Sequence, residues 1–162
     1  MGLVALCPNS EYNIATMMPT VRKSYADNLE SQAQWQCALT LVYNEWPVSM
    51  DRIKRDLRGL HRMVDQKLLG RRFHLRPAHE RSQMWAVVEK SDTYAHVHAG
   101  WKLPLPHDIS ELDAMLKGGL WSTFAPNGEY NLQEYRFGWA GYATKKLQDS
   151  ADIVDSADFL RS

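Results

Sequence analysis

Two runs of β-forming residues, separated by only three turn residues, constrain the fold of this chain most. The runs SQMWAVVEK (82–90) and YAHVHAGWKL (94–103) are bounded by turn formers, and SDT (91–93) joins them. Pro104 and Pro106 end the second run, because proline supplies no N–H group to a strand ladder. The pattern therefore predicts an antiparallel hairpin.

The residues before the hairpin predict one strand and one helix. WQCALTLVYNEW (35–46) is rich in β-formers and predicts a buried strand. VSMDRIKRDLRGLHRMVDQKLLG (48–70) keeps its apolar residues at helical spacing. Ser49 is a candidate N-cap and Gly70 a candidate C-terminal stop, so we expect a helix between them.

The residues after the hairpin predict two more helices and a strand. DISELDAMLKGG (108–119) opens with a capping pattern formed by Ser110 and Asp113 and ends at a glycine pair, which predicts a short helix. The remaining expectations are a loop over 124–131, a strand over 132–137 and a final helix over 138–160.

The expected order of elements is β-α-β-β-α-β-α, which favours one α+β domain. We expect a central, mostly antiparallel sheet with its flanking helices packed on one face. A chain of 162 residues is long enough to bury a core of its own. Residues 1–30 are weakly patterned and are expected to form a helical or irregular lead-in, and residues 149–162 an acidic tail.

Charge is distributed unevenly, although the formal net charge is zero. Residues 52–81 hold ten Lys or Arg against three Asp or Glu, a net charge of +7, while residues 149–162 hold four Asp against one Arg, a net charge of −3. A basic segment of this kind attracts phosphates. A solvated, arginine-rich helix face would explain the same residues.

The cysteines and the hydropathy pattern predict the compartment. Cys7 and Cys37 form no CxxC pair, so neither a disulfide framework nor a zinc knuckle is indicated. The apolar run 3–7 is too short for a signal peptide, and no run approaches the ~18 apolar residues that a membrane span needs. We therefore expect a soluble, cytoplasmic protein with no membrane partner.

A pair of histidines in the second hairpin strand is the first candidate site. His96 and His98 project to the same face of a strand, about 7 Å apart. A tight hairpin about 92–93 places Glu89 directly opposite His96, on that same face. Two imidazoles and one carboxylate suit a catalytic divalent ion, and zinc, magnesium and manganese all fit. Histidines at an exposed or core-edge position are the alternative reading.

A tyrosine followed by two lysines is the second candidate site. On a helix, Tyr142 shares a face with Lys145 and Lys146. A tyrosine hydroxyl becomes a useful nucleophile against a phosphodiester when an ion polarises the phosphate and a nearby cation stabilises the developing charge. The plain alternative is that Tyr142 packs its ring on the sheet while the lysines are solvated.

Taken together, these segments resemble the His-hydrophobe-His (HUH) endonucleases. This family includes the replication initiators (Rep proteins) of rolling-circle plasmids and single-stranded DNA viruses, together with relaxases and transposases. CALTL (37–41) resembles the first-strand motif, EKSDTYAHVH (89–98) the metal motif, and YATKK (142–146) the nucleophile motif. The resemblance spans about residues 35–147, and it makes residues 31–148 a nuclease-like domain.

The resemblance implies a fold, a reaction and a set of partners. The implied fold is the Rep-type antiparallel sheet with flanking helices, a relative of the ferredoxin-like fold. His96, His98 and Glu89 would hold Mg²⁺ or Mn²⁺, and Tyr142 would cut single-stranded DNA or an origin hairpin through a 5′-phosphotyrosine intermediate. Lys145 or Lys146 would position the phosphate or the tyrosine. Rolling-circle replication of a plasmid, phage or related element is the implied process, with any helicase supplied by a separate protein.

Basic residues and tryptophans are further candidates for DNA contact. The arginines expected to track the backbone are Arg55, Arg58, Arg62, Arg71 and Arg72. Trp101, Trp121 and Trp139 are able to stack on unpaired bases, although core packing is the default for tryptophan. Two other functions stay open: a catalytically silent DNA-binding module of the same fold, and a small metal hydrolase acting on another substrate.

Overall fold

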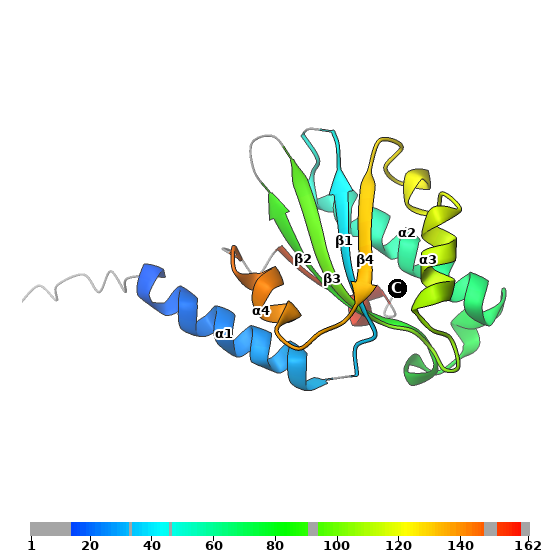
Figure 1. Cartoon of the computed structure of the whole chain (residues 1–162), viewed down its shortest axis with the longest axis horizontal. Coiled ribbons are helices and arrows are strands. Elements are labelled where there is room, and N and C mark those ends of the chain that lie inside the picture. The colour runs from blue at the N-terminus through cyan, green and yellow to red at the C-terminus, as the bar shows by residue number, and fades with distance from the viewer. Residues whose placement is uncertain (1–13, 33, 46, 91–93, 148–151, 160–162) are drawn as a thin grey trace, which may run out of the picture.

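The computed structural model describes residues 14–32, 34–45, 47–90, 94–147 and 152–159. These residues form an α+β fold around one antiparallel sheet, with flanking helices, as expected (Figure 1). The order across the sheet is β4-β1-β3-β2-β5. The strands are β1 (Cys37–Tyr43), β2 (Gln83–Lys90), β3 (Ala95–Lys102), β4 (Glu129–Glu134) and β5 (Ile153–Asp155).

Helices lie on both faces of the sheet, so the expectation of one covered face is wrong. One face carries α1 (Ile14–Gln32) and α4 (Trp139–Thr144), and the other carries α2 (Met50–Leu69) and α3 (Ile109–Lys117) (Figure 1). The physical reason lies in β2, where Met84–Val88 are buried at every position, because successive side chains alternate between two covered faces. Short 3₁₀ turns occur at Phe73–Leu75 (η1), Ala78–Glu80 (η2), Trp121–Thr123 (η3) and Ser156–Phe159 (η5).

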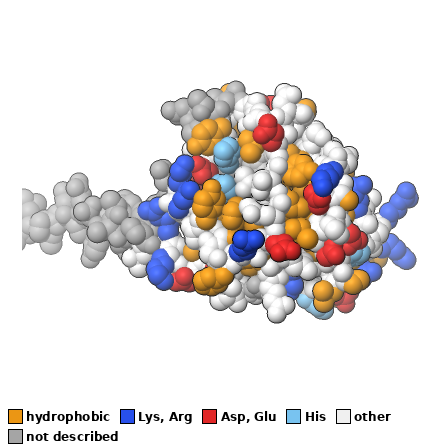
Figure 2. All heavy atoms as spheres, viewed as in Figure 1, with side chains coloured by type: hydrophobic (Ala, Val, Ile, Leu, Met, Phe, Trp, Pro, Cys, Tyr) orange, Lys and Arg blue, Asp and Glu red, His pale blue; other side chains and the backbone are white. Residues whose placement is uncertain are grey.

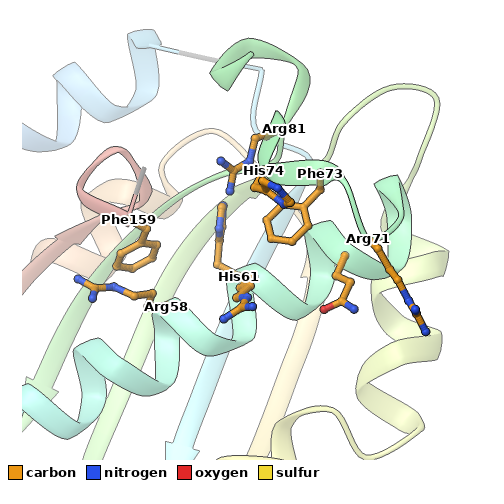
Figure 3. Close-up of a pocket in the computed structure, with 9 residues that line it drawn as sticks. Arg58, His61, Arg71, Phe73, His74, Arg81 and Phe159 are labelled. Carbon is orange, nitrogen blue, oxygen red and sulfur yellow. The ribbon is translucent and has the colours of Figure 1, made fainter. Parts of the chain in front are cut away.

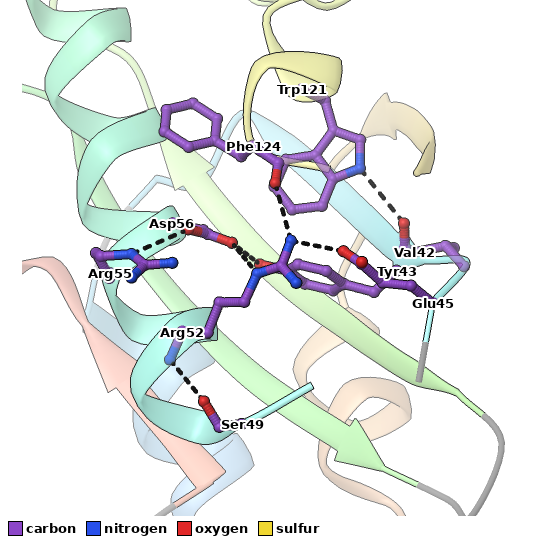
Figure 4. Close-up of polar contacts among 9 residues, drawn as sticks. All are labelled: Val42, Tyr43, Glu45, Ser49, Arg52, Arg55, Asp56, Trp121 and Phe124. Carbon is purple, nitrogen blue, oxygen red and sulfur yellow. Dashed lines mark hydrogen bonds and ion pairs between the residues drawn. The ribbon is translucent and has the colours of Figure 1, made fainter. Parts of the chain in front are cut away.

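The helix predicted over 48–70 is confirmed, together with its caps. The Ser49 hydroxyl accepts a hydrogen bond from the Arg52 N–H at 3.2 Å, and Gly70 ends the helix with φ of 84°, a conformation that favours glycine. Arg52 then reaches away from α2 to the Glu45 carboxylate and the Phe124 carbonyl, which ties the helix start to neighbouring loops (Figure 4).

The cap predicted for the 108–119 helix is wrong by two residues. Asp108 is the N-cap of α3, and it accepts the Ser110 N–H at 2.9 Å. Glu111 completes the capping box by accepting the N–H of Asp108. Asp113 instead pairs with Lys117 on the helix surface, which is an ordinary i,i+4 contact.

The C-terminal part of the chain differs most from the expectation. Strand β4 begins at Glu129, inside the predicted loop, and ends before the predicted limit of 137. Of the helix predicted over 138–160, α4 covers only Trp139–Thr144, and Ile153–Asp155 instead form β5 and pair with β2; residues 148–151 and 160 lie outside the described residues. Val154, opposite Ala86, is buried by that pairing. Part of the segment predicted as an acidic tail therefore completes the edge of the sheet.

A buried polar cluster joins α2 to the start of β2. The Asp65 carboxylate accepts hydrogen bonds from the Ser82 N–H at 3.0 Å, the Ser82 hydroxyl at 2.6 Å and Arg81 Nε at 3.1 Å. His61 Nε2 lies 3.0 Å from the Ser82 carbonyl, and its ring stacks on Trp101. Because the Ser82 hydroxyl is buried and donates to Asp65, the cluster is a structural tie and not an exposed nucleophile.

The burial of His61 should make the stability of the fold depend on pH. Burial lowers the pKa of His61 from 6.5 and outweighs the charge of Asp65, which acts in the opposite direction. The unfolded chain therefore binds a proton here at a pH where the folded chain does not. We expect the free energy of unfolding to decrease as pH falls from 7 to 5, measured by urea denaturation at both values.

Two histidine variants test whether His61 causes the pH dependence of the free energy of unfolding. The dependence should become shallower in His61→Gln and persist in His79→Gln, because His79 is exposed. An equal slope in the wild-type protein and His61→Gln would contradict the role given to His61.

Among the described residues, no helix has the length and apolarity to cross a membrane.

Candidate active site

The hairpin register places the candidate metal ligands on one face of the sheet. Glu89 lies opposite His96 in the β2–β3 pairing, as the sequence predicted. In the β1–β3 pairing, Thr40 lies opposite His98. The turn predicted at 91–93 lies outside the described residues. This face is the one that carries α1 and α4; α4 borders the site, and α1 packs against α4.

His98 is held between a hydroxyl and a carboxylate. Its ring Nδ1 lies 3.1 Å from Thr40 Oγ1, and its Nε2 lies 3.4 Å from a carboxylate oxygen of Glu89. Burial lowers the pKa of His98, and the neighbouring Glu89 carboxylate only partly opposes that effect. A neutral imidazole is therefore favoured near neutral pH, and this is the form that binds metal ions.

Glu89 is mostly buried, with 12% of its side chain exposed. Its second oxygen accepts hydrogen bonds from Lys146 Nζ at 2.5 Å and from the Tyr94 hydroxyl at 3.2 Å. Burial on its own raises the pKa of Glu89, but the contact with Lys146 and the charge near His98 outweigh burial, so the pKa is lowered. Glu89 is therefore an ionised carboxylate at the centre of the site.

Helix α4 is held in place by hydrogen bonds to α1 and to β3. Its N-terminus follows Gly138, whose φ of 94° turns the chain into the helix. The Glu30 carboxylate of α1 accepts the N–H groups of Gly138 at 3.0 Å and Ala140 at 3.1 Å. The Trp139 indole N–H donates to the Ala99 carbonyl of β3 at 3.1 Å. These contacts set the position of Tyr142 relative to the sheet.

Tyr142 contacts both His98 and Trp139. Its ring centroid lies 5.6 Å from that of His98, in an edge-to-face arrangement, and 5.3 Å from that of Trp139, in a stacked arrangement. The residue is 49% exposed. Lys145 Nζ lies 4.0 Å from the ring centroid of Tyr142. An ammonium at this distance makes a cation–π contact with the ring.

The structure therefore brings together all six residues predicted for the catalytic and metal sites, but with different partners. Lys146 pairs with Glu89 and not with the tyrosine. The His96 ring lies 6.3 Å from that of His98 and 4.4 Å from that of Tyr94. Three distant segments, β2–β3, β1 and α4, meet at this place.

A cavity of about 620 Å³ opens beside His98 and Tyr142. Besides these two residues, its lining is Ala38, Thr40, His96, Asn131, Gln133, Glu134, Arg136, Phe137, Gly138 and Trp139. Phe137 is 92% exposed, which is unusual for a large apolar side chain. On the face shown in Figure 2, Lys and Arg side chains gather over α1 and α4 beside histidine and hydrophobic side chains.

Several of these lining residues were not predicted from the sequence. Thr40 carried a usable signal, because it alternates with the apolar Leu39 and Leu41 in a predicted strand and so faces away from them. Asn131 reaches the site only because β4 pairs with β1, placing it opposite Thr40. Nothing in the local sequence fixes that pairing.

The candidate ligands fit a divalent ion in chemistry but are not arranged around one. Among the residues that the structure describes, no group of three or more His, Cys, Asp or Glu is placed to hold a metal ion. The Glu89 oxygens contact Lys146 and His98 instead. However, two donors bound at about 2.1 Å to one ion stand about 3.0–3.4 Å apart, and Glu89 and His98 already show a 3.4 Å separation.

The arginines predicted to bind DNA lie away from this site. Arg55 is exposed and pairs with Asp56 on α2 (Figure 4). Arg58, Arg62 and Arg71 line a different cavity, and α2 packs on the face of the sheet opposite α4. Arg72 is exposed beside η1.

Of the three tryptophans considered for base stacking, one lies at the candidate site and two do not. Trp101 and Trp121 are buried in the core, so the default reading holds for both. Trp139 is partly exposed and lines the candidate site.

Comparisons with protein-family models, with curated proteins and with solved structures gave no match to this chain. The resemblance to the HUH endonucleases therefore depends on the motif residues alone.

Proposed function

We propose that this protein is a metal-dependent, site-specific endonuclease and strand transferase for single-stranded DNA, of the HUH type. The observation that carries the proposal is the contact of the Tyr142 ring with His98, which in turn contacts Glu89. A partly exposed tyrosine beside a histidine–carboxylate pair is an arrangement suited to phosphodiester transesterification.

Tyr142 and Lys145 have distinct roles in the proposed cleavage step. Tyr142 attacks the scissile phosphorus as its phenolic proton leaves, and a bond from phosphorus to the tyrosine oxygen forms. The bond from phosphorus to the 3′ oxygen breaks, and that oxygen takes up a proton. The products are a 5′-phosphotyrosyl link and a free 3′-hydroxyl. Lys145, beside the ring, stabilises negative charge on the phenol.

Glu89, His96 and His98 are the residues that would hold Mg²⁺ or Mn²⁺. The ion would supply polarisation of the scissile phosphate. The fixed Thr40–His98–Glu89 chain orients the imidazole before any ion binds. Lys146 keeps Glu89 ionised and would have to yield one carboxylate oxygen to the ion.

The cavity wall supplies contacts for an unpaired strand. Phe137 and Trp139 offer aromatic surfaces for stacking, and Arg136 offers a cation for the backbone. Such contacts favour a single strand or the unpaired part of an origin hairpin. Initiation of rolling-circle replication of a plasmid, phage or related element is the process we propose, with a separate protein as helicase.

A covalent-adduct assay tests this function without knowledge of the recognition sequence. The protein is incubated with a random-sequence pool of single-stranded oligonucleotides labelled at the 3′ end, with Mn²⁺, Mg²⁺ or EDTA. We expect labelled protein that resists denaturation with either ion, and at least about 30-fold less with EDTA, because polarising the phosphate is worth several kcal/mol. Labelled protein in equal yield with EDTA would contradict metal dependence.

A catalytically silent DNA-binding module is the second candidate. The contacts of Glu89 with Lys146 and His98, in place of an ion-ready arrangement, favour it. Binding of the single-stranded pool that is equal with Mn²⁺ and with EDTA, together with no adduct under either condition, would identify this module and exclude the endonuclease.

A further inference from the structure

A second cavity, of about 520 Å³, lies on the face of the sheet opposite the candidate active site. It is bounded by α2, the η1 and η2 region and η5 (Figure 3). Its lining residues are Arg58, His61, Arg62, Gln66, Arg71, Phe73, His74, Arg81 and Phe159. The volume falls within the range of about 300–1,000 Å³ that is typical of small-ligand pockets.

Among the described residues, the lining is strongly basic and contains no carboxylate. Arg81 is compensated by Asp65, which lies behind it at 3.1 Å. Among the described residues, Arg58, Arg62 and Arg71 have no carboxylate within ion-pair distance. Three uncompensated guanidinium groups around one concave surface favour an anion, and their planar donors match the oxygens of a phosphate.

Aromatic rings form part of the cavity wall. The Arg58 guanidinium lies 5.7 Å from the ring centroid of Phe159, and that of Arg81 lies 5.0 Å from the centroid of Phe73. In Figure 3, Arg58 and Phe159 lie together at one end of the cavity, with His61, Phe73 and Arg81 further along it. Arginine and aromatic side chains arranged in this way are the groups on which a nucleobase stacks.

The cavity floor is held in place by the buried polar cluster. His61 is 1% exposed, and its Nε2 is engaged by Ser82. Arg81 is fixed by Asp65, and Phe73 is buried. The floor therefore keeps its shape without a ligand, which lowers the entropic cost of binding.

From these observations we propose that the cavity binds one nucleotide, with its base against Arg58 and Phe159 and its phosphate on Arg62 and Arg71. The nucleotide is either a free nucleoside phosphate or the 5′-phosphorylated end of a strand, because both present the same phosphate chemistry. The proposal is independent of the proposed endonuclease function, because the cavity shares no residue with the Tyr142 site.

Isothermal titration of the full chain tests the proposal with four probes. These are AMP, adenosine, inorganic phosphate and a 5′-phosphorylated trinucleotide. We expect AMP or the trinucleotide to bind at least tenfold more tightly than adenosine or phosphate, because both halves of the site must be filled. If the trinucleotide binds more tightly than AMP, the natural ligand is the 5′-phosphorylated end of a strand. If AMP binds more tightly, the natural ligand is a free nucleotide.

Matched charge variants locate the binding. Arg58→Gln and Arg62→Gln should each weaken binding of the tighter probe about tenfold or more. Arg72→Gln removes an equal charge from an exposed position that does not line the cavity, and should change binding less than twofold. All three positions are exposed, so the variants should fold, which their thermal midpoints check.

Two results would overturn the proposal. One is an equal loss of affinity in Arg72→Gln and Arg58→Gln, which would mean general attraction to a basic surface. The other is affinity for inorganic phosphate equal to that for AMP. Chemical shifts of the Phe159 ring on addition of AMP give a readout that needs no variant, and an unmoved ring would also count against the site. Tyr142→Phe should leave AMP binding unchanged, which separates this proposal from the endonuclease.

Discussion

Replacing Tyr142 with phenylalanine should reduce the yield of the labelled protein–DNA adduct about 1,000-fold or more. The phenol oxygen is the only atom removed, and on the proposed reaction it is the nucleophile, so no covalent link can form without it. The ring should keep its stacking on Trp139 and its edge contact with His98, because neither contact involves the hydroxyl. Binding of the single-stranded pool should therefore stay within about twofold of wild type. The adduct assay and a filter-binding titration measure the two quantities.

Tyr135→Phe is the matched control for this variant. Tyr135 lies just after β4, and burial together with the Glu30 carboxylate raises the pKa of its hydroxyl, which makes it a poor nucleophile. Its loss should leave the adduct yield within about twofold. If Tyr142→Phe formed adduct as well as wild type, the assignment of the nucleophile would be wrong. If Tyr135→Phe alone lost the adduct, the nucleophile would be Tyr135.

Replacing Asp65 with alanine should lower the free energy of unfolding by about 3–4 kcal/mol. Asp65 is fully buried and accepts three hydrogen bonds, from the N–H and hydroxyl of Ser82 and from Arg81. Its removal leaves two buried donors and one largely buried guanidinium without their acceptor. Urea denaturation at pH 7 measures the change, read as a lower midpoint at an unchanged slope.

Asp113→Ala is the control for this second effect. Asp113 forms an i,i+4 ion pair with Lys117 on the surface of α3, and such pairs contribute only about 0.3–0.5 kcal/mol. A loss below about 1 kcal/mol in Asp65→Ala, similar to the loss in Asp113→Ala, would contradict the role of the buried cluster. Asp65→Ala should also make Arg81 more mobile at the cavity proposed to bind a nucleotide. The affinity of this variant for AMP should therefore be compared with that of the wild-type protein under conditions where both are equally folded.

The parts of the fold that the sequence predicted correctly are those set by short-range interactions. The runs 82–90 and 94–103 are close enough in sequence to form a hairpin, and the fold predicted about residues 92–93 places Glu89 opposite His96, as the structure shows. Ser49 and Gly70 bound α2, because a cap is made with residues only a few positions away. The cap of α3 was misplaced because two acceptable pairs, Ser110 with Asp113 and Asp108 with Glu111, lie two positions apart.

The parts that the sequence did not predict depend on distant partners. Strand β5 contains only Ile153, Val154 and Asp155, which is too short a run to predict a strand by itself. Its pairing with the edge of β2 stabilises the extended conformation. Helices on both faces follow from the packing of α1, which has only a weak apolar stripe.

At the candidate site, the sequence by itself determined which residues are candidates for the chemistry and which of them share a strand face. His96 and His98 share a face because strand side chains alternate with period two, and Tyr142 neighbours Lys145 because a helix turns every 3.6 residues. Only the tertiary structure decided that His98 binds Thr40, that Lys146 pairs with Glu89, and that the basic residues of α2 surround a separate cavity. The reason is physical: contacts between segments tens of residues apart are selected by the burial of the whole apolar surface, and no local pattern encodes that global choice.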